Sequence, residues 1–125
     1  MSKPLDSTRL QHLGYAAERV LNRLGDTTLQ EFLADEDLQD ILLRQFTVIG
    51  EAAAHISDSV KQRFPHLNWR QVVGFRNFVV HEYFRIDFTL VYDTATGVLP
   101  RLVADLPAVL QQILADEATK QQSSV

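Results

Sequence analysis

The segment 74–83 holds the side chains best suited to chemistry on a phosphate group. Its sequence is Gly-Phe-Arg-Asn-Phe-Val-Val-His-Glu-Tyr, so Arg76, Asn77 and His81 interleave with apolar residues. An arginine presents a planar fork of donors that grips a phosphate, and a histidine transfers protons near neutral pH. RNA carries its own nucleophile, the 2′-hydroxyl. Arginine plus histidine is therefore close to a minimal set for cleaving RNA without a metal ion.

On one straight helix these side chains would not all point the same way. Asn77 and His81 are four residues apart and share a face, whereas Arg76 and His81 are about 140° apart. Tyr83, seven residues after Arg76, lies nearly in line with it. Three arrangements could still join Arg76 and His81 at one phosphate: a long reach by the arginine, a helix that ends near His81, or a second copy that supplies half the site.

The remaining ionisable residues give weaker indications. Single polar residues on helices usually face solvent or cap an end, and His12, His55 and His66 are scattered along the chain. Glu51 and His55 have the i,i+4 spacing of two metal ligands, but no second such helix pair accompanies them, so we expect a surface contact. The chain has no cysteine, which excludes thiol catalysis and cysteine-based zinc sites.

The elements that must position these residues are predicted to be helices. The 125 residues, 46% hydrophobic and 22% charged, suit one globular domain. In the first half, apolar residues recur every three or four positions over 5–24, 29–33 and 35–60. We expect Asp6 or Ser7 to cap the first helix and Gly25 to end it. The last of these segments is predicted to be a single helix of about six turns, with Gly50 kept for close contact between helices.

The second half is predicted to hold the remaining helices. Asn68 is a good N-cap for a helix from Trp69 to His81 or Tyr83, and Asp87 for the next one. Gly97 interrupts the pattern, and a last helix restarts at Leu99-Pro100, with a kink expected at Pro107. The prediction is an all-α, up-and-down bundle of four to five helices in one domain, residues 1–115. A polar tail, residues 116–125, is expected to fray.

Membrane insertion and secretion are not indicated by the sequence. No stretch approaches the roughly 20 apolar residues that span a bilayer, and the N-terminus has no apolar leader segment. We therefore expect a cytoplasmic protein.

A resemblance to a known family sharpens this interpretation. The run Arg76-Asn77-x-x-x-His81-x-Tyr83 resembles the R-(N/H/D)-x-x-x-H-x-Y motif of the HepT-like toxins, a branch of the HEPN superfamily. Further stretches follow in the family's order and together extend the resemblance over about residues 10–114: Ile49-Gly50-Glu51-Ala52-Ala53, Trp69 with Val73-Gly74-Phe75-Arg76-Asn77, Ile86-Asp87 and Leu99-Pro100. One departure from the family pattern is Pro107.

The resemblance implies a specific function. It implies a HEPN-like dimer with a cleft between the chains, and a metal-independent toxin ribonuclease of a type II or VII toxin–antitoxin system. Arg76 and His81 would be catalytic and Asn77 supporting. The partner would be a minimal nucleotidyltransferase of the MNT type, an antitoxin that transfers AMP from ATP to Tyr83. The chain itself would need no cofactor, because ATP would be used by the partner.

Two other functions stay open at this point: a non-catalytic module that binds nucleotide or RNA and acts through a nucleotidyltransferase partner, and a purely structural helical dimer. The charge distribution favours RNA. The net charge is −4, but residues 61–85 contain five basic residues and one acidic residue, hence +4, which leaves −8 for the rest. Positive charge therefore gathers around the motif, while the acidic remainder discourages unspecific binding to nucleic acid.

Overall fold

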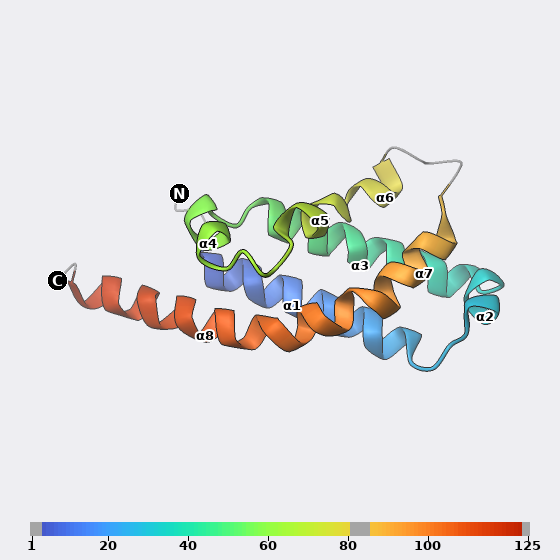
Figure 1. The fold of residues 1–125 in the computed structure, drawn as a ribbon, viewed down its shortest axis with the longest axis horizontal. Coiled ribbons are helices and arrows are strands. Elements are labelled where there is room, and N and C mark those ends of the chain that lie inside the picture. The colour runs from blue at the N-terminus through green and yellow to red at the C-terminus, as the bar shows by residue number, and fades with distance from the viewer. Residues whose placement is uncertain (1–3, 81–85, 124–125) are drawn as a thin grey trace.

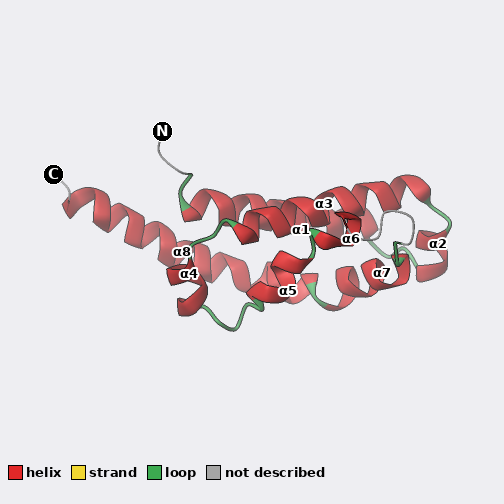
Figure 2. Ribbon diagram, turned by 90° about the horizontal axis from the view of Figure 1, so that it is seen from above, coloured by secondary structure: helices red, strands yellow, loops and turns green. Residues whose placement is uncertain are grey.

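The computed structural model describes residues 4–80 and 86–123, and in this part of the chain every regular element is a helix. This confirms the predicted all-α class (Figures 1 and 2). In chain order the helices are α1 (Asp6–Leu24), α2 (Leu29–Leu33), α3 (Glu36–Ala54), α4 (Asp58–Arg63), α5 (Trp69–Gly74), α6 (Asn77–Val80), α7 (Phe88–Gly97) and α8 (Leu99–Ser123).

The long helices pack side by side around one core (Figures 1 and 2). Helix α1 packs against both α3 and α8, while the short helices α5 and α6 lie along α3. Helix α7 leads into α8 and also contacts α2. The fully buried side chains lie on the predicted helical stripes and include Leu13, Val20, Phe46, Ile49 and Val109. The α3 helix is therefore the scaffold against which the 74–80 region rests.

The residues at the helix ends act partly as predicted. Gly25 ends α1 with a φ of 50°, and Asn68 and Asp87 cap α5 and α7. The predicted cap of α1 is wrong, because no side chain caps the helix locally. Asp6 instead accepts hydrogen bonds from the backbone N–H and the hydroxyl of Ser57, at 2.9 and 2.8 Å. It thereby ties α1 to the start of α4.

The predicted helix over 35–60 is also wrong in its extent, because α3 ends at Ala54 with His55 as its C-cap. A new helix, α4, starts after Ser57, whose hydroxyl accepts from the N–H of Val60. The hydrophobic spacing runs across the break because Ile56 and Val60 are both buried. Periodicity reports which residues face the core, and two consecutive helices on the same core can share one pattern.

Helix α8 runs through Pro107 without interruption and continues to Ser123. The polar residues 116–123, expected to fray, are thus helical, and Asp116 and Glu117 among them contact the body of the protein. Glu117 accepts from both the backbone N–H and the hydroxyl of Ser7, at 3.2 and 2.6 Å. Asp116 pairs with Arg63 on α4. These contacts use polar groups, which is why hydrophobic spacing gave no sign of them.

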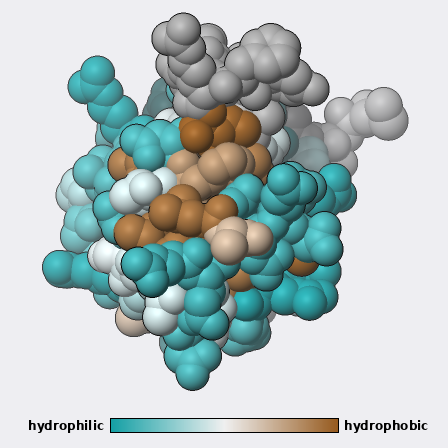
Figure 3. All heavy atoms as spheres, turned by 90° about the vertical axis from the view of Figure 1, so that its right-hand side faces the viewer, coloured by the Kyte–Doolittle hydropathy of each residue, from teal (hydrophilic) through white to brown (hydrophobic). Residues whose placement is uncertain are grey.

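The end of the molecule that holds α2 and the start of α7 exposes some apolar surface. Figure 3 shows an apolar strip there within a largely hydrophilic surface. Leu33 and Leu90 on these two helices are nearly half exposed. Within the described residues, no single helix has the length and apolar character of a membrane span. Only α7 and α8 taken together do, and they are bent by 46° where they meet.

Candidate functional site

The residues singled out for chemistry begin at a break between two short helices. The predicted helix from Trp69 to His81 or Tyr83 is interrupted at Phe75 and Arg76, which form a turn between α5 and α6. Backbone N–H groups in this turn bond three residues back, from Phe75 to Val72 at 3.2 Å and from Arg76 to Val73 at 3.4 Å. Bonds of this i→i−3 type belong to a 3₁₀ turn, which is wound more tightly than an α-helix.

This break alters the expected geometry of the motif. The angle of about 140° holds for one straight helix, whereas Arg76 lies in the turn that precedes α6. Asn77 is the first residue of α6 and is exposed. The predicted catalytic His81 and the predicted acceptor Tyr83 lie outside the described residues. The structure therefore places Arg76 and Asn77, and the positions of His81 and Tyr83 stay predictions.

An aromatic cluster fixes the turn to α3. The ring of Phe46 on α3 meets Phe75 and Phe78 edge-on, with centroids 5.1 and 5.4 Å apart, and those two rings stack on each other at 5.8 Å. At the start of α5, the indole N–H of Trp69 donates to the carbonyl of Phe64 at 2.9 Å. Edge-on and offset aromatic pairs stabilise beyond their buried area. The apolar residues of the motif thus hold its polar ones in place.

Gly50 provides the closest contact between α3 and the motif. A Cβ atom on Gly50 would lie 2.5 Å from the backbone nitrogen of Arg76 and 2.9 Å from the carbonyl oxygen of Val73. Real Cβ atoms do not approach other atoms so closely, so only glycine fits here. This confirms the expectation of close helix contact at Gly50, and it identifies the neighbour as Arg76 itself.

The next residue of α3, Glu51, contacts the arginine side chain. The Nη1 of Arg76 lies 3.5 Å from Oε1 of Glu51, and the arginine side chain keeps 39% of its surface exposed. The other carboxylate oxygen of Glu51 lies 3.7 Å from Nε2 of His55. The expected Glu51–His55 contact is confirmed. The Glu51–Arg76 pair was missed, since no sequence rule pairs residues 25 positions apart.

The arrangement around Arg76 suits binding of a phosphate. One side of the guanidinium rests against a carboxylate, which orients it, while the exposed part stays open to a ligand. Within residues 4–80 and 86–123, no group of three or more acidic or histidine side chains could hold a metal ion. Glu51 and His55 offer two such groups.

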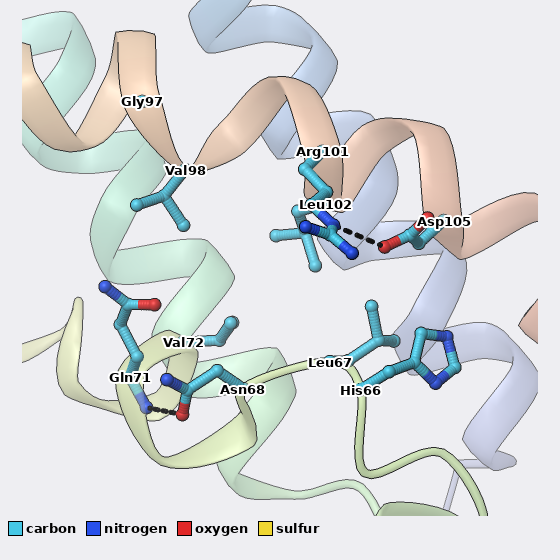
Figure 4. Close-up of a pocket in the computed structure, with 10 residues that line it drawn as sticks. All are labelled: His66, Leu67, Asn68, Gln71, Val72, Gly97, Val98, Arg101, Leu102 and Asp105. Atoms are coloured by element: carbon cyan, nitrogen blue, oxygen red, sulfur yellow. Dashed lines mark hydrogen bonds and ion pairs between the residues drawn. The ribbon is translucent and has the colours of Figure 1, made fainter.

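Two hollows lie near these elements. One, of about 480 Å³, lies between the α5 start and the α7–α8 junction, and Figure 4 shows its lining. It contains His66 and the ion pair of Arg101 with Asp105, 3.7 Å apart, but none of residues 76–80, the described part of the motif. The other, of about 380 Å³, is a groove between α1 and α3 that includes Glu51 and His55. Only the second reaches a residue that contacts Arg76.

Comparison with known proteins assigns the chain that carries this site to a family. A family model described as "Ribonuclease HepT-like" matches residues 14–109. "Putative RNase MJ1380" of Methanocaldococcus jannaschii is 28% identical over 94 residues, covering 75% of this chain and 86% of that protein. "Putative RNase TTE0752" of Caldanaerobacter subterraneus subsp. tengcongensis is 23% identical over 103 residues, 82% of this chain and 92% of its own length.

A third relative carries the family's name. "Probable ribonuclease HepT" of Thermococcus cleftensis is 27% identical over 93 residues, 74% of this chain and 84% of that protein. No solved structure matches the chain. The matched region contains α3, the aromatic cluster and the whole 76–83 motif. Because the family model covers well over half of the sequence, the chain belongs to the HepT-like ribonuclease family of the HEPN superfamily.

Proposed function

We propose that the protein is a metal-independent endoribonuclease that uses Arg76 and His81. The observation that supports this most directly is the partly exposed side chain of Arg76, which is held against α3 inside a region that matches a ribonuclease family. A fixed cation with open donors is what the transition state of phosphate cleavage requires, because negative charge builds up on the phosphate oxygens.

The proposed reaction needs no nucleophile from the protein. The 2′-hydroxyl oxygen of a ribose attacks the adjacent phosphorus, a new P–O2′ bond forms, and the P–O5′ bond breaks. One proton leaves the 2′-hydroxyl and one is delivered to the departing O5′. In this proposal His81 handles proton transfer, Arg76 stabilises the charged phosphate, and Asn77 orients the phosphate or His81. The products are a 2′,3′-cyclic phosphate and a free 5′-hydroxyl.

The site is proposed to be completed by dimerisation. In the described residues Arg76 lies in a turn between α5 and α6, so one straight helix does not carry the motif. Two copies related by a two-fold axis would bring two motifs, and two positive 61–85 segments, into one cleft. This arrangement would concentrate positive charge where RNA binds, although the whole chain is acidic.

Regulation by a partner is the other part of the proposal. We propose that the chain is the toxin of a toxin–antitoxin pair, and that an MNT-type nucleotidyltransferase silences it by transferring AMP from ATP to Tyr83. The tyrosyl oxygen would attack the α-phosphorus of ATP and displace pyrophosphate. An adenylyl group two residues from His81 would place bulk and a negative phosphate where the RNA phosphate must bind.

Expression of the protein alone tests the ribonuclease activity. We expect growth arrest and RNA fragments with cyclic phosphate ends, both lost in Arg76→Ala and His81→Ala. Arg101→Ala is the matched control, since Arg101 is an exposed arginine on α8 outside both the motif and the positive 61–85 segment. RNA that stays intact with the wild type would refute catalysis. Binding without cleavage, lost in Arg76→Ala, would instead support the non-catalytic module.

Co-expression with a candidate nucleotidyltransferase tests the regulation. The intact mass of the protein should rise by whole adenylyl units, and Tyr83→Phe should abolish the increase. A Tyr83→Phe protein that still gains these units would contradict the assignment of the acceptor. Protection from toxicity without any mass change would show that the partner acts by steric block.

A further inference from the structure

The groove between α1 and α3 has a mixed chemical character. The apolar side chains that line it on α3 are Val48 and Ala52, here called its floor, and the polar side chains that line it, here called its rim, can donate or accept hydrogen bonds. Those rim residues are Arg9 and His12 on α1 and Thr47, Glu51 and His55 on α3. Apolar walls with a few placed polar groups are typical of sites that bind small organic groups.

The groove adjoins the candidate catalytic site through one shared residue, Glu51. Glu51 lines the groove and at the same time contacts Nη1 of Arg76 at 3.5 Å. Arg76 is itself fixed on α3 by the backbone contact at Gly50. A chain of nucleotides whose phosphate lies at Arg76 would therefore have its next ribose and base within reach of the groove. None of the described residues that line the hollow in Figure 4 forms an ion pair with Arg76, whereas Glu51 in the groove does.

The groove is also organised before any ligand binds. Nη1 of Arg9 donates to the backbone carbonyl of His55 at 2.7 Å, which ties the rim of α1 to the end of α3. The carboxylate of Glu51 can accept from a ribose hydroxyl or a base N–H group, while Arg9 and His12 can donate. The hollow, about 380 Å³, falls in the range of small-molecule sites.

From these observations we propose that the α1–α3 groove is a subsite for the nucleoside that neighbours the cleaved phosphate. The base lies on Val48 and Ala52, the ribose or base edge bonds to Glu51, and His12 contacts the polar edge on the opposite side. This proposal rests on the proposed ribonuclease function, and it assigns the groove a role in binding RNA rather than in proton transfer.

Two variants of the groove test it. Ala52→Leu fills the floor with a residue that suits a helix, and His12→Ala removes an exposed rim side chain. With a fluorescent single-stranded RNA 12-mer of mixed sequence, we expect KM to rise at least fivefold in each, and kcat to stay within twofold. His66→Ala, in the other hollow, is the matched control and should change neither constant.

A crosslinking experiment gives an independent readout. A DNA 12-mer with 4-thiothymidine lacks the 2′-hydroxyl, cannot be cleaved by this route and should crosslink to residues 4–12 or 47–55 of the full-length protein. If the wild type does not cleave RNA, the proposed function fails, while crosslinks to these peptides would still support the groove. If it cleaves RNA and both variants keep the wild-type KM, the groove proposal alone fails. Unchanged KM with altered sedimentation would overturn it in favour of an interface between copies.

Discussion

Substitution of Gly50 by alanine is the sharpest test of how α3 positions the motif. Gly50 is in the interior of α3, where alanine would ordinarily stabilise the helix by up to about 1 kcal/mol. The added Cβ would, however, lie 2.5 Å from the nitrogen of Arg76 and 2.8 Å from its Cβ. One of these atoms is part of the backbone and the other is attached directly to it, so neither can move aside as the end of a flexible side chain could.

The expected magnitude follows from these opposing terms. Inserting a methyl group into a closely packed contact costs about 1–3 kcal/mol, and this contact should lie near the upper limit because the backbone must shift. After the gain in helix propensity, a net loss of about 1–2 kcal/mol in the free energy of unfolding remains. Displacement of Arg76 by even about 1 Å should also lower kcat/KM by at least tenfold, since misplaced catalytic groups lose rate steeply.

Gly14→Ala is the matched control for this experiment. Gly14 is also in the interior of a long helix, but its added Cβ would be 3.7 Å from Leu106 Cδ1, an ordinary contact. Urea unfolding should therefore show Gly14→Ala as stable as or more stable than the wild type, and Gly50→Ala as less stable. RNA cleavage by the folded fractions completes the comparison. If Gly50→Ala gained stability like Gly14→Ala and kept its activity, the contact with Arg76 would not be what positions the motif.

Three further predictions concern other contacts. Phe46→Leu removes both edge-on ring contacts, so the free energy of unfolding by urea should fall by about 1–2 kcal/mol, with activity falling as well. Glu117→Ala removes the acceptor of two bonds from Ser7 and should cost about 1–2 kcal/mol; in the double variant with Ser7→Ala, a double-mutant cycle of thermal unfolding should show coupling. The Thr28 backbone N–H, and then its hydroxyl, lower the pKa of Glu31. The stabilisation of the folded protein by these hydrogen bonds is thus present above the pKa that Glu31 has in the unfolded state. It is lost as the pH falls through the lower pKa of the folded state. NMR titration of Thr28→Val should show the pKa of Glu31 moving upward.

The sequence predicted the fold well where a single physical signal decides the structure. The hydrophobic spacing identified the buried face of each long helix, and Gly25, Asn68 and Asp87 act at helix ends as predicted. The prediction failed where the same hydrophobic spacing is compatible with two different structures, one long helix or two shorter ones in succession. Ile56 and Val60 continue the pattern of α3 although they lie beyond its end, because the core does not distinguish one helix from two in succession.

Contacts between polar residues that lie far apart in the sequence could not be predicted from residue spacing. Asp6 and Ser7 were predicted to cap α1, but they do not cap it and instead bond to Ser57 and Glu117. Their partners are 51 and 110 positions away, so only the packing of α1 against α4 and α8 could specify them. Local rules give what a polar side chain can do, and the tertiary fold selects which partner it finds.

In the candidate site, too, local sequence rules predicted the chemistry but not the contacts between distant residues, with one informative exception. The residue types and spacing of Arg76, Asn77 and His81 indicated the chemistry, but nothing local indicated that Glu51 would contact Arg76. Gly50 did carry a signal, because a glycine inside a long amphipathic helix is unfavourable unless another backbone passes close by. The structure shows that this backbone is the turn at Arg76. An unfavourable residue in a scaffold helix therefore marked where the functional segment docks, and the residue that follows it contacts the functional side chain.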